Sequence, residues 1–160
     1  MTTTTPQTEI IVDPDVPTVR IVREFDAPPA KVFRAHVDPE LFVQWVGPDA
    51  LDESEVDRWD CRTGGEWRYV SRADGQDHWF HGSFHEVRED ECIIQTFTYE
   101  GFPDGVSLER IDIEDLGNGR TRLTATSLVD SFESRDAMVA SGMETGVVEG
   151  YRHLDALLAR

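Results

Sequence analysis

The chain has 160 residues, of which 39% are hydrophobic, which suits one domain with its own apolar core and leaves no room for a multidomain assembly. Its formal net charge of −17 at pH 7 repels phosphate backbones and anionic lipid head groups, so nucleic acids and membranes are excluded as expected partners. The acidic surface fits either a solvated coat that maintains solubility or a docking face for a basic partner.

The cysteines and the first residues indicate a reduced, cytoplasmic protein without a metal site. Cys61 and Cys92 stand outside any CxxC or Cys/His ligand spacing, and the N-terminus lacks the basic and then apolar order of a signal peptide. Apolar runs such as residues 10–12 are far shorter than the roughly 20 residues that span a bilayer. Lys31 is the one lysine, so a Schiff-base mechanism could involve only that residue.

The N-terminal part predicts a tail and then a strand. Residues 1–17 are expected to form a flexible tail without a functional role, with a short strand at residues 10–12, ahead of a single domain over residues 18–160. From Thr18 to Phe25 apolar and polar residues alternate, which predicts the first long strand.

Two short helices are expected next. Asp26 and the prolines after it predict a helix start, with the Asp26 carboxylate capping free N–H groups. A second helix begins after Asp38, buries an apolar stripe that includes Trp45, and ends at Gly47-Pro48.

Extended runs then occupy the chain from Leu51 to Val129, so about six strands joined by hairpins are expected to form an antiparallel meander. The turns between them lie at residues 61–65, 73–75, 88–91, 101–105 and 117–119. From about Ser134 to Ala159 apolar residues return at helical spacing, which predicts one long amphipathic helix. This helix alone is long enough to cover the apolar face of a curved sheet, so the order of elements predicts an α+β fold of the helix-grip type.

Short segments in this order resemble the START-like (SRPBCC) superfamily, in particular the bacterial branch related to the C-terminal domain of the activator of Hsp90 ATPase. The resemblance covers about residues 18–159. The matching segments are residues 23–28 (REFDAP) with Val32 and Phe33, residues 38–40 (DPE) with Trp45, and residues 60–67 (DCRTGGEW), 82–87 (GSFHEV), 119–124 (GRTRLT), 142–146 (GMETG) and 154–158 (LDALL).

The resemblance implies a cavity between the sheet and the C-terminal helix that holds a lipid-like or aromatic ligand, and it implies no particular reaction. Lipid carriers, hormone receptors, polyketide aromatase/cyclases and a co-chaperone domain share the superfamily, so function has to be argued from the site. Aromatic side chains with a few polar groups are typical of such cavities. The residues expected to line this one are Trp45, Trp67, Tyr69, Trp79, His81, Phe97, Tyr99, Arg110, Met143 and Val147.

Polar members of this set have competing interpretations. His81 could be a polar contact or general base in the cavity, whereas the spacing of His78, His81 and His85 does not suit a metal. Arg110 could bind a carboxylate or phenolate ligand, or could pair at the surface with Glu109 or Asp112.

Three glycines, Gly142, Gly146 and Gly150, recur every four residues in the expected C-terminal helix. Each costs about 1 kcal/mol relative to alanine in a helix. They indicate either close packing against the sheet or a partner helix, or room for a ligand beneath the helix. Apolar faces left at this ridge or at the sheet edge are compatible with a homodimer.

Motifs for hydrolysis, nucleotide binding and hydride transfer are absent from the sequence, so no cofactor is expected. The first hypothesis is therefore binding of a small hydrophobic or aromatic molecule between sheet and helix. The second is a cofactor-independent aromatase/cyclase-like or lyase enzyme that uses His81, Tyr99 or Arg110. The third is a module that interacts with the chaperone Hsp90.

Overall fold

The computed structural model describes residues 8–47, 53–73 and 75–160 of the chain. The strands are β1 (Glu9–Val12), β2 (Thr18–Phe25), β3 (Glu53–Trp59), β4 (Glu66–Ala73), β5 (Gln76–Arg88), β6 (Cys92–Tyr99), β7 (Ser107–Gly117) and β8 (Arg120–Leu128). The helices are α1 (Pro29–Val37), α2 (Pro39–Trp45), α3 (Phe132–Ala140) and α4 (Met143–Leu158). Parts of four sequence expectations lie outside the described residues: residues 1–7, Pro48, Leu51 and Asp74.

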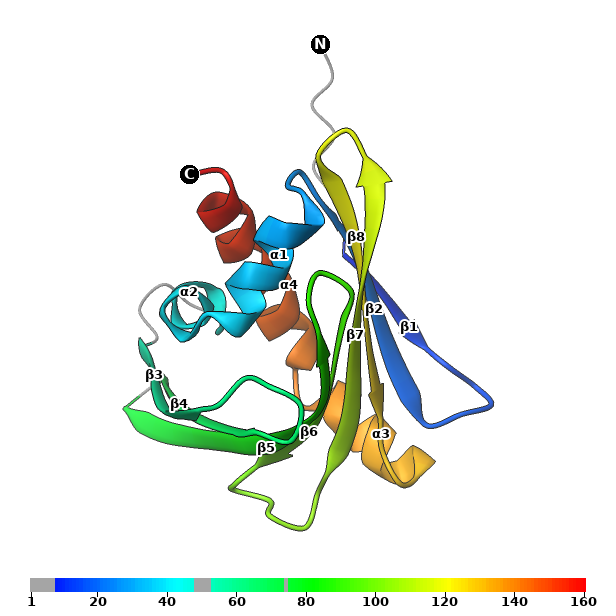
Figure 1. The fold of residues 1–160 in the computed structure, drawn as a ribbon. Helices are drawn as coiled ribbons and strands as arrows, with labels where there is room; N and C mark the ends of the chain where they lie inside the picture. The colour runs from blue at the N-terminus through cyan, green and yellow to red at the C-terminus, as the bar shows by residue number, and fades with distance from the viewer. Residues whose placement is uncertain (1–7, 48–52, 74) are drawn as a thin grey trace.

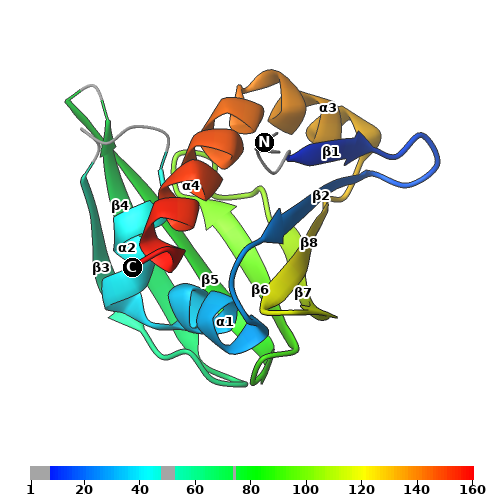
Figure 2. The same ribbon diagram turned by 90° about the horizontal axis from the view of Figure 1, so that it is seen from above.

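Within this range the strands form one antiparallel sheet in the order β1-β2-β8-β7-β6-β5-β4-β3. The sheet is strongly curved, and α1, α2 and α4 lie on its concave side (Figure 1). Figure 2 shows α4 lying across this concave side beside the two short helices. The predicted α+β helix-grip fold is confirmed. None of the described helices combines the length and apolar character needed to cross a bilayer.

The two short helices form where the sequence predicts them, but only one has the expected cap. The Asp38 carboxylate accepts a hydrogen bond of 3.0 Å from the backbone N–H of Glu40 at the start of α2, as Asp does at a helix N-terminus. Asp26 does not cap α1, which begins after Pro28 without a side-chain cap. The Asp26 carboxylate instead accepts a hydrogen bond of 2.8 Å from Nε of Arg120, and this ion pair takes the place of the predicted helix cap.

The C-terminal segment forms two helices, not the one that was predicted. Gly142 has a backbone φ of 89°, a left-handed conformation that L side chains avoid, and it separates α3 from α4. Helix α3 is tied to the β1–β2 connection, because Nη1 of Arg135 donates hydrogen bonds to the carbonyls of Asp13 and Thr18. Helix α4 then crosses the concave side of the sheet in a different direction from α3 (Figure 2).

Two polar contacts hold α4 in place. Arg23 on β2 is only 2% exposed, and its guanidinium donates two hydrogen bonds to the carboxylate of Asp155 on α4, one of them 2.9 Å long. Lys31 on α1 donates to the backbone carbonyl of Leu158 and, at 3.1 Å, to that of Arg160. Such carbonyls lack intrahelical partners at a helix C-terminus, so the ammonium group fixes the end of α4.

The apolar core lies under α4 and continues toward the aromatic strands. Leu154 of α4 and Leu123 of β8 are fully buried, and the Tyr151 ring meets Phe25 edge-on with 5.4 Å between ring centroids. A second cluster surrounds Trp67. Between the two clusters the concave side is not completely filled, and this gap forms the candidate site.

Candidate functional site

A cavity of about 410 Å³ lies between the concave face of the sheet, α2 and α4; we call it the inner cavity. Its lining residues are Ile21, His36, Phe42, Trp45, Val46, Gly47, Trp59, Trp67, Tyr69, Phe80, Phe84, Ile93, Gln95, Phe97, Glu109, Ile111, Ala125, Ser127, Met143, Gly146, Val147, Gly150 and Tyr151. Most of these are aromatic or aliphatic, and few carry polar atoms, as is usual in sites for small organic molecules.

Aromatic rings of β4, β5 and β6 form one wall. The Tyr69 ring is stacked between Trp67 and Phe80, with centroid distances of 5.7 and 5.1 Å, and Trp67 also contacts Phe97. Gly82 faces Trp67 across the β4–β5 pair, where an added Cβ would lie 2.8 Å from the indole. The same Cβ would clash with the backbone carbonyl oxygen of Thr96, so the glycine is required by the close approach of β6 as well as by this wall.

The indole N–H groups are used differently on the two sides of the cavity. On the helix side, Nε1 of Trp45 donates to the carbonyl of Ala35 at 2.9 Å, and Nε1 of Trp59 donates to that of Val37 at 2.7 Å. Both rings are thus held against α1. Nε1 of Trp67 is buried and has no hydrogen-bond partner among the described residues.

A carboxyl group lies on the cavity wall formed by β7. Glu109 is paired in register with Gln95 on β6 and with Ser127 on β8, so the three side chains share the concave face. Burial raises the pKa of Glu109 to about 7, and the hydroxyl of Ser127 offsets only part of this effect. Such a carboxyl group exchanges its proton near neutral pH.

The other titratable groups of the cavity stay neutral at pH 7. Burial lowers the pKa of His36, whose Nδ1 lies 2.8 Å from the carbonyl of Val32. Burial, with a smaller effect of the Glu109 charge, raises the pKa of Tyr69 and of Tyr151. Glu109 is therefore the group of the wall that carries charge around neutrality.

Six of the ten residues predicted to line the cavity do so: Trp45, Trp67, Tyr69, Phe97, Met143 and Val147. The other four lie elsewhere. Tyr99 is on the same face as Phe97 but beyond the cavity, where its hydroxyl is 3.0 Å from Nδ1 of His78. Trp79, His81 and Arg110 point to the convex side of the sheet, because they alternate along their strands with the inward-facing Phe80, Gly82 and Glu109.

Arg110 is thus corrected from a cavity residue to a surface one. Its Nε lies 3.0 Å from both carboxylate oxygens of Asp112, which is the surface pairing that the sequence left open. The cavity receives the preceding residue, Glu109, so the charge offered to a ligand changes from positive to negative.

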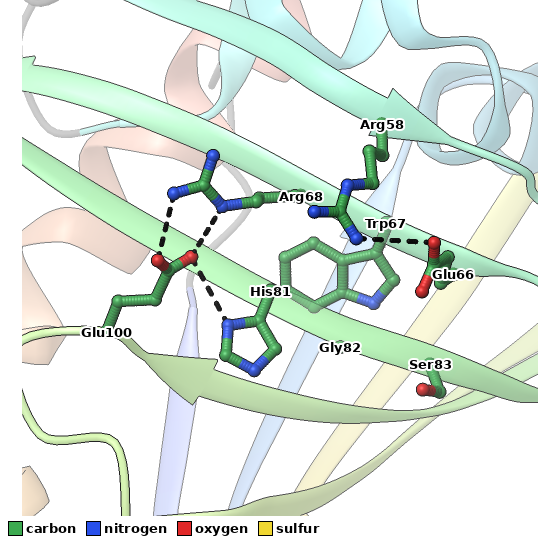
Figure 3. Close-up of a pocket in the computed structure, with 8 residues that line it drawn as sticks. All are labelled: Arg58, Glu66, Trp67, Arg68, His81, Gly82, Ser83 and Glu100. Atoms are coloured by element: carbon green, nitrogen blue, oxygen red, sulfur yellow. Dashed lines mark hydrogen bonds and ion pairs between the residues drawn. The ribbon is translucent and has the colours of Figure 1, made fainter.

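His81 belongs to a second, polar depression on the convex side, which we call the outer groove (Figure 3). It is lined by Arg58, Glu66, Trp67, Arg68, His81, Gly82, Ser83 and Glu100. Nδ1 of His81 is 3.2 Å from Glu100, and Arg68 contacts the same carboxylate through two hydrogen bonds of 2.8 and 2.9 Å. The hydrogen bonds from Arg68 lower the pKa of Glu100. The guanidinium of Arg68 also lies 3.9 Å from the ring centroid of Trp79. The Glu100 carboxylate is thus shared between Arg68 and His81.

The three glycines have three different roles. Gly142 is the left-handed residue before α4, and a Cβ on Gly150 would lie 3.4 Å from the carbonyl oxygen of Trp45, so Gly150 allows close packing. A Cβ on Gly146 would meet nothing within 4 Å, and this residue lines the cavity. Close packing therefore describes Gly150, which lies against the end of α2, while room for a ligand remains a prediction for Gly146.

We expect alanine to have opposite effects at two of these positions. Gly146→Ala should raise the free energy of unfolding by up to about 1 kcal/mol, because alanine is the better helix former and meets no obstacle. Gly142→Ala should lower it by about 1–2 kcal/mol, because the left-handed backbone strains a Cβ. Urea denaturation of both variants checks the pair, and equal effects at the two sites would contradict this assignment.

The chain is similar to known proteins along nearly its whole length. Residues 26–159 match the family model for activator of Hsp90 ATPase homolog 1-like protein. A crystal structure of a protein from Mycobacterium smegmatis has a TM-score of 0.85 at 24% identity, covering 94% of this chain and 96% of that one. A solution structure from Arthrobacter aurescens has a TM-score of 0.85 at 26% identity, covering 94% and 91%.

A third solved structure, from Chromobacterium violaceum, has a TM-score of 0.79 at 28% identity and covers 89% of this chain and 97% of that one. No curated protein matches the chain at a significant level. The family match spans the four described helices and the six strands from β3 to β8. The chain therefore belongs to the family of activator of Hsp90 ATPase homolog 1-like proteins.

Proposed function

We propose that the protein binds a small, mainly apolar or aromatic molecule in the inner cavity. The observation that carries this proposal is a space of about 410 Å³ that the protein's own side chains leave open beneath α4. Close packing is the rule in protein interiors, and a gap of this size lined by aromatic rings suits an organic guest. Burial of the guest would gain about 25 cal/mol for each Å² of apolar surface removed from water.

The backbone of α4 contributes to this space. Gly146 removes a side chain that would otherwise point into the cavity, while Met143 and Val147 supply apolar contacts on the same helix. The flexible thioether of Met143 can adapt to guests of different shape. The side of α4 that lines the cavity can thus contact a guest without occupying the space that the guest needs.

A pair of substitutions at Gly146 tests the proposal with naphthylethanol as the probe. The probe should raise the melting temperature of the wild type and of Gly146→Ala, since a ligand of the folded state stabilises it. Gly146→Leu should weaken binding by more than about tenfold, because the longer side chain occupies the guest's space. Calorimetric titration gives the dissociation constants.

Gly146→Ala is the matched control for helix propensity, since its single methyl group takes up far less of the cavity than the leucine side chain. If wild type and Gly146→Leu bound the probe equally well, the inner cavity would not be the site. Absence of any binding or thermal shift in the wild type would contradict the proposal for aromatic guests of this size.

The two other hypotheses receive less support from the site. The enzyme hypothesis relied on His81, Tyr99 and Arg110, which lie outside the inner cavity, and only Glu109 is placed to exchange a proton with a guest. The Hsp90 hypothesis depends on the description of the family. A pull-down with purified Hsp90 would test it independently of the cavity.

A further inference from the structure

We propose that the ligand of the inner cavity carries a protonated amine, which pairs with the Glu109 carboxylate while the aromatic walls enclose its apolar body. This inference rests on the proposed function and adds the chemical class of the ligand. Three features of the described residues support it: the position of Glu109, the absence of a competing cation, and the arrangement of rings and acceptors around it.

Glu109 is held on the concave face by its strand register and cannot turn to the surface without disrupting β7. Its neighbours across the sheet are Gln95 and Ser127, both of which can offer oxygen acceptors beside the carboxylate. A primary ammonium group has three N–H donors and no acceptor. The three side chains therefore match the hydrogen-bonding needs of such a group.

Cations of the protein do not satisfy this carboxylate. No lysine or arginine lines the inner cavity, and no ion pair to Glu109 occurs among the residues that the structure describes. The next residue, Arg110, faces away and is paired with Asp112. The buried Arg23 is already engaged by Asp155. A buried charge without a partner is costly, so a ligand that brings a positive charge offsets that cost.

The aromatic wall favours the same ligand class. The faces of tryptophan and tyrosine rings carry negative potential and attract cations that lie within about 6 Å. Trp67 lines the cavity together with Glu109, whereas the faces of the Tyr69 ring are covered by Trp67 and Phe80. The overall charge of −17 also attracts cations to the molecule.

The same arrangement disfavours acidic ligands. A fatty acid or an aromatic acid would bring a second carboxylate to Glu109, with His36 neutral and no cation in the wall to compensate. Like charges in a poorly hydrated site repel strongly. A neutral alcohol can still donate one hydrogen bond, but it gains no charge–charge attraction. The expected order of affinity is amine, alcohol, acid.

Three probes of similar shape test this order by calorimetric titration at pH 7: naphthylethylamine, naphthylethanol and naphthylacetate. The amine should bind about tenfold tighter than the alcohol or better, the gain expected of a charge-assisted hydrogen bond in a buried site. Since the bound cation keeps Glu109 ionised, amine binding should also release about half a proton, measured by repeating the titration in buffers of different ionisation enthalpy.

Glu109→Gln should remove both the preference and the proton release while leaving the alcohol bound. Glu89→Gln, in the exposed turn between β5 and β6, removes the same charge from the surface and should leave the preference intact. If the alcohol or the acid binds as tightly as the amine, or if Glu109→Gln keeps the preference, the amine inference is overturned and the binding function stands. If none of the three probes binds, both fail.

Discussion

Replacing Asp155 by alanine is expected to lower the free energy of unfolding by about 3 kcal/mol, the lower end of the range for breaking a buried ion pair. The loss arises because Arg23, only 2% exposed, would keep its charge with one carbonyl, that of Glu24, as its remaining hydrogen-bond acceptor. Asp155 itself is 35% exposed, which is why the upper end is not expected. Chemical denaturation at pH 7 measures the effect.

Two further variants separate the ion pair from general effects on α4. Arg152→Ala breaks the exposed pair with Glu149 on the same helix and should cost less than about 1 kcal/mol. Arg23→Met combined with Asp155→Leu removes both charges and should be far less harmful than Asp155→Ala. A loss below 1 kcal/mol for Asp155→Ala would mean that the buried guanidinium finds other partners.

Replacing Glu109 by glutamine is expected to stabilise the protein in a pH-dependent way, by about 2 kcal/mol at about pH 8 and hardly at all at about pH 4. Burial raises the folded-state pKa of Glu109 from 4.5 to about 7. The folded state therefore binds the proton more tightly than the unfolded chain, and the penalty grows as the pH rises from 4.5 to 7. A full shift of this size is worth about 3 kcal/mol, reduced here because the carboxyl group is not wholly enclosed.

The other titratable groups that face Glu109 do not produce the same dependence of stability on pH. Tyr69 and Tyr151 stay protonated throughout this range, and His36 stays neutral above its lowered pKa. Surface carboxylates titrate alike in both proteins and cancel in the difference. Denaturation curves between about pH 4 and pH 8, with Glu89→Gln as the control, measure that difference. A pH-independent difference would show that Glu109 is not desolvated.

Elements with unambiguous local patterns could be predicted from the sequence. Alternation from Thr18 to Phe25 predicts β2 with its correct faces, because every second residue from Val19 to Phe25 is buried, although Ile21 and Val22 are adjacent apolar residues. The Asp38 cap places the start of α2 correctly. Glycine at position 142 was visible, but only the backbone shows that it lies in the left-handed region and divides the C-terminal segment.

The faces of the middle strands could not be predicted in the same way. Residues 78–81 are all aromatic or histidine, so neither face of β5 stands out, and cross-strand register decides which side chains enter the cavity. The register also shifts between Phe84 and Glu86, which sequence spacing does not reveal. In β7, Glu109, Ile111 and Ile113 occupy every second position and all face inward. This spacing was the sequence signal that could have placed Glu109 on the cavity wall.

The contact between α1 and the end of α4 has a practical consequence. Lys31 provides the only side-chain primary amine in the chain, and that amine is occupied by the carbonyls of Leu158 and Arg160. Acylation of this amine by a fluorophore would remove its positive charge and therefore weaken the contact that holds the end of α4.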